Sequence, residues 1–307
     1  MKPLKIVFMG SPDFAVPSLE RIHESEHILE AVVSNPDRRR GRRSKPEPTD
    51  VKKRAVELGY PVIDADDLKS SAFIDELKQH RADLYVVVAF RILPPKVLEI
   101  PSIGSVNLHA SLLPKYRGAA PIHWAVINGE KETGCTVFFL DEKVDTGKII
   151  GQAKTKIGLM ETTGDLYERL KVRGADLLLE SIDKIARDKY TLIPQDDSLA
   201  SPAPKLHRSN TKIDFSRPAT EVHNFIRGLN PFPVAWCLYD SEKMNIYESK
   251  PVKRVNLPAG KLAIVNGKLY AGCAEGSVEL KKVQVPGSKK MTGTEFINGF
   301  DVDVFLK

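Results

Sequence analysis

Two polar side chains lie two residues apart at the end of a segment that is otherwise typical of a buried strand. Residues 105–108 predict a strand, and Asn107 and His109 lie at its carboxyl end. Because side chains alternate along a strand, both point to the same side. A polar turn at residues 141–147 follows the next predicted strand and could bring Asp145 against His109. Buried polar groups at a strand end need partners or a use.

An amide, an imidazole and a carboxylate together suit acyl transfer to an amine. Asn107 and a protonated His109 could donate hydrogen bonds to a tetrahedral oxyanion, each donor being commonly worth about 10²–10³ in rate. Asp145 could hold His109 protonated and collect the amine proton, directly or through water. The sequence leaves a structural explanation open, in which His109 is a hydrogen-bonded strand end and Asp145 caps its own turn.

Other common chemistries lack their residue patterns. The sequence has no nucleophile-elbow Ser or Cys, no His-Glu-x-x-His and no phosphate-binding Gly-Lys-Thr/Ser loop. The first predicted strand ends at Gly10 and continues Ser-Pro-Asp-Phe, which lacks the Gly-x-Gly-x-x-Gly of nicotinamide-cofactor sites. The seven histidines are scattered, so we expect no metal site.

Strands and helices alternate over the first 187 residues. The strands are expected at residues 4–9, 29–34, 61–63, 84–89, 105–108 and 135–140. The helices are expected after the turn at 10–13 as far as 23, and at 51–58, 72–80, 121–128 and 162–187. This alternation predicts an α/β fold, with a Rossmann-like, mostly parallel sheet and helices on both faces. Ligands of such sheets bind outside the carboxyl ends of the strands.

The pattern changes after residue 188. Residues 189–206 contain three prolines among polar residues, which is typical of a linker. Five short strands and a helix at 294–300 then predict an OB-like small β-barrel, a fold that often binds nucleic acid. The strands are expected at 235–239, 244–248, 261–265, 268–271 and 277–285, with a hairpin turn at Asn266-Gly267. We therefore predict a catalytic domain at 1–188, a linker at 189–206 and a C-terminal domain at 207–307.

Positive charge is concentrated in two places. The net charge of the chain is +6, the stretch 38–45 holds six Lys and Arg residues and no acid, and residues 207–307 carry a net +5. Two basic regions could hold a polyanion at two points, although a charge run is often only a solvated loop.

The cysteines and the apolar segments indicate in which cellular compartment the protein is expected. The three cysteines include no Cys-x-x-Cys pair, and no apolar run is long enough for a signal peptide or a membrane span. We therefore expect a cytoplasmic protein in a reducing compartment, without a membrane or an obligate protein partner.

Three ordered motifs resemble the 10-formyltetrahydrofolate-dependent formyltransferases. They are residues 107–114 (Asn-Leu-His-Ala-Ser-Leu-Leu-Pro), 117–122 (Arg-Gly-Ala-Ala-Pro-Ile) and 145–147 (Asp-Thr-Gly). Residues 10–15 also fit, and residues 225–236 resemble in particular the members that act on methionyl-tRNA. The resemblance covers essentially the whole chain and is strongest in the first domain.

The resemblance implies transfer of a formyl group from the co-substrate 10-formyltetrahydrofolate to the amine of initiator methionyl-tRNA. Asn107, His109 and Asp145 match the family's catalytic trio. Residues that match its folate site are Ser111, Leu112, Leu113, Pro114, Phe90, Arg91, Ile92, Leu93 and Asp141. Residues 90–93 depart from the Tyr-Gly-Leu-Ile-Leu form that is common in members acting on methionyl-tRNA.

The basic stretch matches in position a loop that the family inserts at the tRNA acceptor end. The resemblance therefore implies tRNA contacts for Arg38, Arg39, Arg40, Arg42, Arg43 and Lys45, and for Lys205 in the linker. Phosphate contacts would supply affinity rather than sequence reading. Lys205 has the alternative of an ordinary surface lysine. Phe232 and Trp236 are expected in the barrel core rather than stacked on bases.

Two other functions stay open. A formyltransferase for a small amine, such as glycinamide ribonucleotide or an amino sugar nucleotide, would share the trio but would not need the basic loop. An inactive RNA-binding module on the same scaffold is the third possibility, and the intact trio argues against it.

Overall fold

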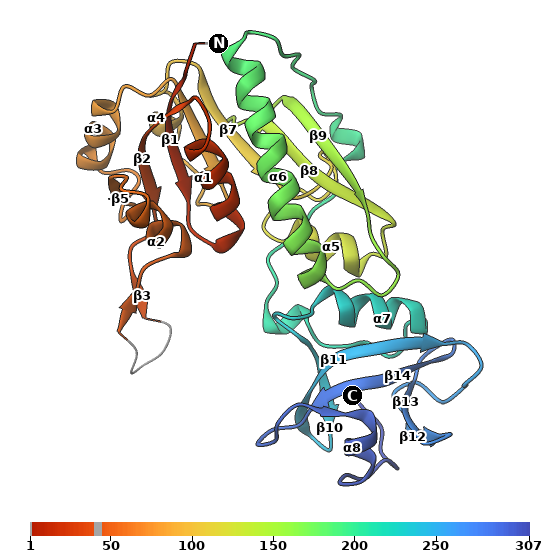
Figure 1. The fold of residues 1–307 in the computed structure, drawn as a ribbon. Coiled ribbons are helices and arrows are strands. Elements are labelled where there is room, and N and C mark those ends of the chain that lie inside the picture. Colours follow the sequence, from red (N-terminus) through yellow and green to blue (C-terminus); the bar gives the residue numbers. More distant parts are fainter. Residues whose placement is uncertain (1, 40–44) are drawn as a thin grey trace. The chain divides into compact units, whose positions relative to one another are not determined.

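A computed structural model describes residues 2–39 and 45–307, and the chain divides into two compact units (Figure 1). The first unit comprises Met1–Gly118, Gly134–Thr155 and Tyr167–Pro202. The second comprises Ala119–Thr133, Lys156–Leu166 and Ala203–Lys307. The predicted fold class is confirmed, because a mostly parallel sheet with helices is joined to a C-terminal antiparallel β domain. The domain boundaries 1–188, 189–206 and 207–307 remain a prediction.

The first unit is built on a seven-stranded sheet in the order β5-β2-β1-β6-β7-β8-β9. From β5 to β7 along this order the strands run parallel, and β8 is antiparallel to β7. The strands are β1 (Lys5–Gly10), β2 (Ile28–Ser34), β5 (Val62–Asp64), β6 (Leu84–Val88), β7 (Gly104–His109), β8 (Glu132–Phe139) and β9 (Ile149–Lys156). The sequence did not predict β9, since only its first two residues are buried and polar residues dominate the rest.

Helices cover both faces of this sheet. They are α1 (Val16–His23), α2 (Asp50–Glu57), α3 (Ser71–Gln79), α4 (Pro95–Leu98) and α6 (Thr163–Ala186). On one face α3 and α4 share a core with Val7 and Val87. On the other face α6 packs closely against β7, because a Cβ added to Gly174 would lie 2.9 Å from Leu108 Cδ2. Every residue of β6 is buried, as its lack of polar alternation predicts.

The second unit contains an antiparallel sheet in the order β10-β11-β14-β13-β12, with β15 paired to β14. Its strands are β10 (Ala235–Tyr239), β11 (Glu242–Val252), β12 (Leu262–Val265), β13 (Lys268–Gly272), β14 (Ser277–Gln284) and β15 (Met291–Thr292). Its helices are α5 (Pro121–Ile127), α7 (Ala219–Gly228) and α8 (Gly293–Ile297). Asn266 and Gly267 join β12 to β13 with positive φ at both positions (50° and 72°), so the predicted two-residue hairpin turn is confirmed.

Residues 304–307 close this sheet. The backbones of Leu238 and Lys307 exchange two hydrogen bonds, which join this segment to β10. Leu262 N donates to Val304 O and Leu306 N donates to Gly260 O, which joins the same segment to β12. The two edge strands of the sheet are therefore bridged, and the β domain has the closure expected of a small barrel.

Helix α7, which the sequence analysis missed, buries an imidazole. His223 is only 4% exposed, its Nε2 donates to Leu159 O (3.4 Å), and its Nδ1 accepts from the Ser249 hydroxyl (3.0 Å). Burial lowers the pKa of His223 to about 4. The ring is therefore neutral in the folded protein at pH 7.

The buried His223 makes stability depend on pH. Between an unfolded pKa of about 6.5 and the folded pKa of about 4, the unfolded chain binds the extra proton, so stability falls as pH drops through this window. The expected loss from this one group is about 3 kcal/mol. We expect His223→Gln to flatten the pH dependence of the free energy of unfolding, measured in urea at pH 7 and pH 4.5. Equal pH dependence in both proteins would contradict the assignment.

Candidate active site

The predicted trio gathers at the carboxyl end of β7. Asn107 and His109 alternate with Leu108, whose side chain packs against α6, so both polar side chains face the opposite side of the sheet. Asp145 comes from the turn between β8 and β9. Its Oδ2 lies 3.7 Å from His109 Nδ1. The expected meeting of Asp145 with His109 is therefore observed, and the roles of the three side chains remain a proposal.

The hydrogen bonds of His109 define which ring nitrogen carries the proton. Nε2 lies 2.8 Å from the backbone oxygen of Tyr116. Because a carbonyl oxygen only accepts, Nε2 must donate. The neutral ring therefore presents a lone pair on Nδ1 toward Asp145.

Asp145 is held by a neighbouring loop and does not cap its own turn. Its Oδ2 accepts a hydrogen bond from Gly118 N at 2.8 Å. Gly118 has φ +122°, a conformation that favours glycine. Asp145 itself has φ +56°, which is uncommon for a residue with a side chain. The alternative in which the Asp145 carboxylate caps its own turn is therefore not observed.

Asn107 keeps donor capacity for a ligand. Its Nδ2 donates to Val87 O at 3.1 Å across the β6–β7 pair. A carboxamide nitrogen carries two hydrogens, so this bond orients the group and leaves the second N–H. The side chain is only half-buried, and the free N–H is available to a substrate.

Two further residues shape the Asp145 turn, and the sequence analysis did not single them out. Gly147 passes so close to β8 that an added Cβ would lie 1.7 Å from Phe139 O. Gln195 Nε2 donates to Asp145 O (2.9 Å) and to Gly147 O (2.8 Å). Gln195 lies between a proline and an aspartate in a segment without periodicity, and no signal in the sequence identifies it.

The predicted folate motif at 111–114 is a loop held from inside the protein. The Ser111 hydroxyl is buried and donates to Lys115 O at 2.6 Å. Thr136 Oγ1 bonds Ser111 O and Leu113 N, and Gln152 Nε2 bonds Leu113 O. Ser111 and Leu113 thus fix the loop, whereas Leu112 and Pro114 are half-buried.

The other predicted folate residues lie in two segments. Phe90 and Arg91 are half-buried, Leu93 is buried, and Ile92 is 75% exposed just after β6. The Arg91 guanidinium bonds the backbone oxygens of Ala65 and Asp66, so it anchors the segment. The exposed Ile92 supplies apolar surface that a pterin could cover.

Asp141 is exposed, and its Oδ1 oxygen is engaged within its own turn. It accepts hydrogen bonds from Lys143 N at 3.0 Å and from the Thr146 hydroxyl at 2.7 Å. Asp141 therefore helps to shape the turn that carries Asp145, and its assignment to the folate site stays a prediction.

The described part of the basic stretch is the base of a hairpin. β3 (Arg38–Arg39) pairs with β4 (Pro46–Glu47), and Figure 1 shows this hairpin projecting from the first unit. Arg38, Arg39 and Lys45 are exposed, whereas Arg40, Arg42 and Arg43 lie outside the described residues. Lys52 anchors the base through ion pairs to Asp37 and Asp64, each 2.8 Å long.

The second unit contains Lys205, the remaining residue predicted to contact tRNA, and two aromatic residues whose predicted burial is wrong. Lys205 is exposed on this unit. The expectation that Phe232 lies in the barrel core is wrong, because it is 76% exposed in the loop before β10. Trp236 is also outside the core: it is half-buried, and the cations of Arg208, Lys212 and Lys243 lie 5.5–5.9 Å from its ring centre. Both residues belong to a proline-rich run. The hydrophobicity of its side chains does not by itself show that the run is exposed.

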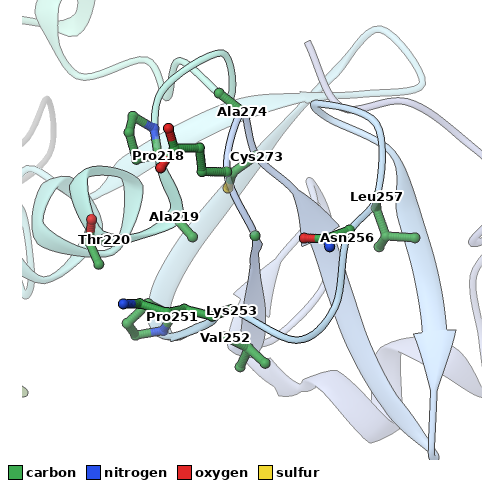
Figure 2. Close-up of a pocket in the computed structure, with 12 residues that line it drawn as sticks. Pro218, Ala219, Thr220, Pro251, Val252, Lys253, Asn256, Leu257, Cys273 and Ala274 are labelled. Carbon is green, nitrogen blue, oxygen red and sulfur yellow. The ribbon is translucent and has the colours of Figure 1, made fainter.

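A cavity of about 520 Å³ opens in the second unit between the start of α7 and the end of β11 (Figure 2). No residue predicted for catalysis or folate binding lines it. The ionisable side chains in its lining are Lys253, Cys273 and Glu275, and burial raises the pKa of the Cys273 thiol to about 11. Among residues 2–39 and 45–307, no three His, Cys, Asp or Glu side chains gather as metal ligands would. No helix of these ranges has the length and hydropathy of a membrane span.

Comparison with known proteins identifies the family. The family model "Formyl transferase" matches residues 4–182, and the model of the formyl transferase C-terminal domain matches residues 205–301. The chain belongs to the formyl transferase family. The resemblance read from the motifs at 107–114, 117–122 and 145–147 is therefore confirmed.

Two curated formyl transferases align along almost the full chain. The methionyl-tRNA formyltransferase of Chlorobium limicola is 45% identical over 306 residues, which is 97% of this chain and 96% of that protein. The methionyl-tRNA formyltransferase of Bacteroides thetaiotaomicron is 40% identical over 309 residues, which again is 97% and 96%.

A solved structure shares the fold at lower identity. It is an N-formyltransferase from Helicobacter canadensis in complex with folinic acid and dTDP-3-aminofucose. The TM-score is 0.67 at 22% identity, covering 90% of this chain and 98% of that one.

Proposed function

We propose that this formyl transferase moves the formyl group of 10-formyltetrahydrofolate onto the amino group of initiator methionyl-tRNA. The observation that supports this chemistry is the position of His109 Nδ1, which lies 3.7 Å from the Asp145 carboxylate. Asn107 lies at the same strand end, and one N–H of its carboxamide is not used by the bond to Val87 O. The choice of acceptor is supported by the relatives, since methionyl-tRNA formyltransferases align over almost the entire chain.

In the proposed reaction, the amine nitrogen attacks the formyl carbon and a new C–N bond forms. The carbonyl oxygen becomes an oxyanion, which accepts hydrogen bonds from the second N–H of Asn107 and from Nδ1–H of protonated His109. Nε2 of His109 cannot contribute, because it already donates to Tyr116 O. Asp145 stabilises the imidazolium and receives the proton that the attacking amine loses, directly or through water.

Collapse of the tetrahedral species completes the transfer. The bond between the formyl carbon and N10 of the folate breaks, and N10 receives the proton that left the amine. The products are a formamide on the aminoacyl-tRNA and tetrahydrofolate, so atoms and charge balance without a metal or an oxidant. Leu112, Pro114 and the exposed Ile92 offer the apolar surface that would hold the folate.

One assay tests the proposed function. Purified protein would be given 10-formyltetrahydrofolate with charged initiator tRNA, and in parallel with glycinamide ribonucleotide or an amino sugar nucleotide. We expect formylation of the methionyl-tRNA at a kcat/KM several orders of magnitude above that of either small amine. Preference for a small amine would contradict methionyl-tRNA as the acceptor. No transfer to methionyl-tRNA or to either small amine would indicate a binding module.

The basic hairpin gives a separate prediction about tRNA affinity. Replacing Arg38, Arg39 and Lys45 together by Gln should raise the KM for methionyl-tRNA and leave the KM for the folate unchanged. The salt dependence should also flatten, by roughly 0.7–0.9 in log–log slope for each phosphate that is no longer neutralised. KM would be measured between 50 and 200 mM KCl.

The matched control for the hairpin replaces three exposed lysines elsewhere on the first unit. Lys2, Lys69 and Lys189 would be changed together to Gln, which removes the same total charge. An equal change of KM and salt slope in the hairpin and control variants would show that only net charge matters, and would contradict a localised tRNA contact.

A further inference from the structure

We propose that Gln195 is a positioning residue for the catalytic carboxylate, in that its side chain locks the turn and the loop between which Asp145 is held. This inference rests on the proposed function for its link to turnover. Its structural part, the fixing of Asp145 against His109, stands on the contacts of the first unit alone.

The amide nitrogen of Gln195 fixes the turn that carries Asp145. Nε2 donates to the backbone oxygens of Asp145 and Gly147, at 2.9 and 2.8 Å. Both hydrogens of this nitrogen are therefore used, and the backbone oxygens of the two residues that flank Thr146 are tied to one point. Asp145 needs such support, because a non-glycine residue at φ +56° is in a sparsely populated conformation.

The amide oxygen of Gln195 fixes the opposite side. Oε1 accepts from Arg117 Nε (3.1 Å) and Nη2 (2.8 Å). Arg117 directly precedes Gly118, whose N–H donates to Asp145 Oδ2 at 2.8 Å. One carboxamide thus joins the turn that bears the carboxylate to the loop that binds it.

Only a carboxamide satisfies both sides at once. The turn requires two donors and the guanidinium requires an acceptor, and a glutamine side chain offers both from one planar group. Glutamate keeps the acceptor and strengthens the pairing with Arg117, but it has no hydrogen to give the two carbonyl oxygens. Methionine has similar length and loses both functions. The two variants therefore separate anchoring of Arg117 from anchoring of the turn.

The Asp145 site is sensitive to small displacements. His109 Nδ1 and Asp145 Oδ2 are already 3.7 Å apart, so a further shift weakens their interaction directly. A misplacement of about 1 Å in a catalytic group can cost on the order of 10²-fold in rate. Both functions of the Gln195 amide are used within the protein, by Arg117 and by the Asp145 turn, so its loss should lower turnover rather than binding.

The test compares Gln195→Glu and Gln195→Met with Gln79→Glu, a matched control at an exposed position of α3. We expect kcat to fall ten- to a hundredfold in both Gln195 variants, with the KM for methionyl-tRNA and for the folate within twofold of wild type. Gln79→Glu should keep wild-type kcat. Thermal unfolding should show that Gln195→Glu keeps its fold, because its contact with Arg117 remains.

Three results would overturn the proposal. They are a wild-type kcat in Gln195→Glu, a rise in KM without a fall in kcat, and a loss of kcat that only follows a lower melting temperature. A crystal structure of Gln195→Met gives a readout independent of activity: the His109–Asp145 separation should exceed the wild-type value. If wild-type protein transfers formyl to no amine, the proposed function fails, and this separation alone then decides the role of Gln195.

Discussion

Asp145→Asn should lower kcat by about 10²–10⁴, the usual contribution of a general acid–base group. The amide can still accept from Gly118 N, so the turn is kept, but it neither stabilises a charged His109 nor takes a proton from the amine. The KM values for both substrates should change little, because the carboxylate acts after binding. Steady-state kinetics of formyl transfer to methionyl-tRNA measure this.

The control for Asp145→Asn is Asp75→Asn, the same chemical change on the exposed surface of α3. It should leave kcat at the wild-type value. If Asp145→Asn kept more than a tenth of wild-type turnover, Asp145 would be a structural acceptor for Gly118 and nothing more.

Asn107→Ala should lower kcat by about 10²–10³, the cost of one oxyanion donor. The affinity for the folate, measured by calorimetry on the same variant, should fall only modestly because the oxyanion forms after binding. Asn107→Asp is the sharper variant. It keeps the shape, removes both N–H donors and places negative charge beside the developing oxyanion, so it should be at least as slow. Unchanged turnover in Asn107→Ala would remove this residue from the oxyanion site.

Much of the fold could be predicted because its signals are local. The uninterrupted apolar run of β6 indicates a strand buried on both faces, and Asn266-Gly267 indicates a two-residue hairpin. Helices α2 and α3 start at Asp50 and Ser71, one residue before the predicted starts, and the side chains of Thr49 and Ser70 cap them by accepting hydrogen bonds from the first turn. β9 was missed because polar residues dominate it after its first two positions, whereas α7 has a local signal that the sequence analysis overlooked, with Val222 and Ile226 buried at helical spacing.

The sequence predicted those parts of the site that depend on residue type and spacing. It did not predict the parts that depend on tertiary packing. Asn107 and His109 share a strand face, and Asp145 lies in a polar turn, so their types and spacing suggested the trio. Which nitrogen of His109 is free depends on the carbonyl of Tyr116, and no sequence rule gives that bond. Gln195 reaches Asp145 across 50 positions and has no pattern of its own.

The second unit is not continuous in sequence, and this limits how it can be dissected. Arg227 of α7 is buried and donates to Glu161 O at 2.7 Å and to Gly158 O at 3.2 Å. Gly228 packs directly against Ile127 of α5, with no room for a side chain. A recombinant fragment that starts at Ala203 would retain the strands of the barrel, but Arg227 would lose both backbone acceptors and keep only Asn224 Oδ1. The apolar flank of α7 that packs on α5 would also become exposed to solvent. Such a truncation would be a poor reagent for tRNA-binding studies, whereas a version with grafted copies of residues 119–133 and 156–166 would supply the missing partners.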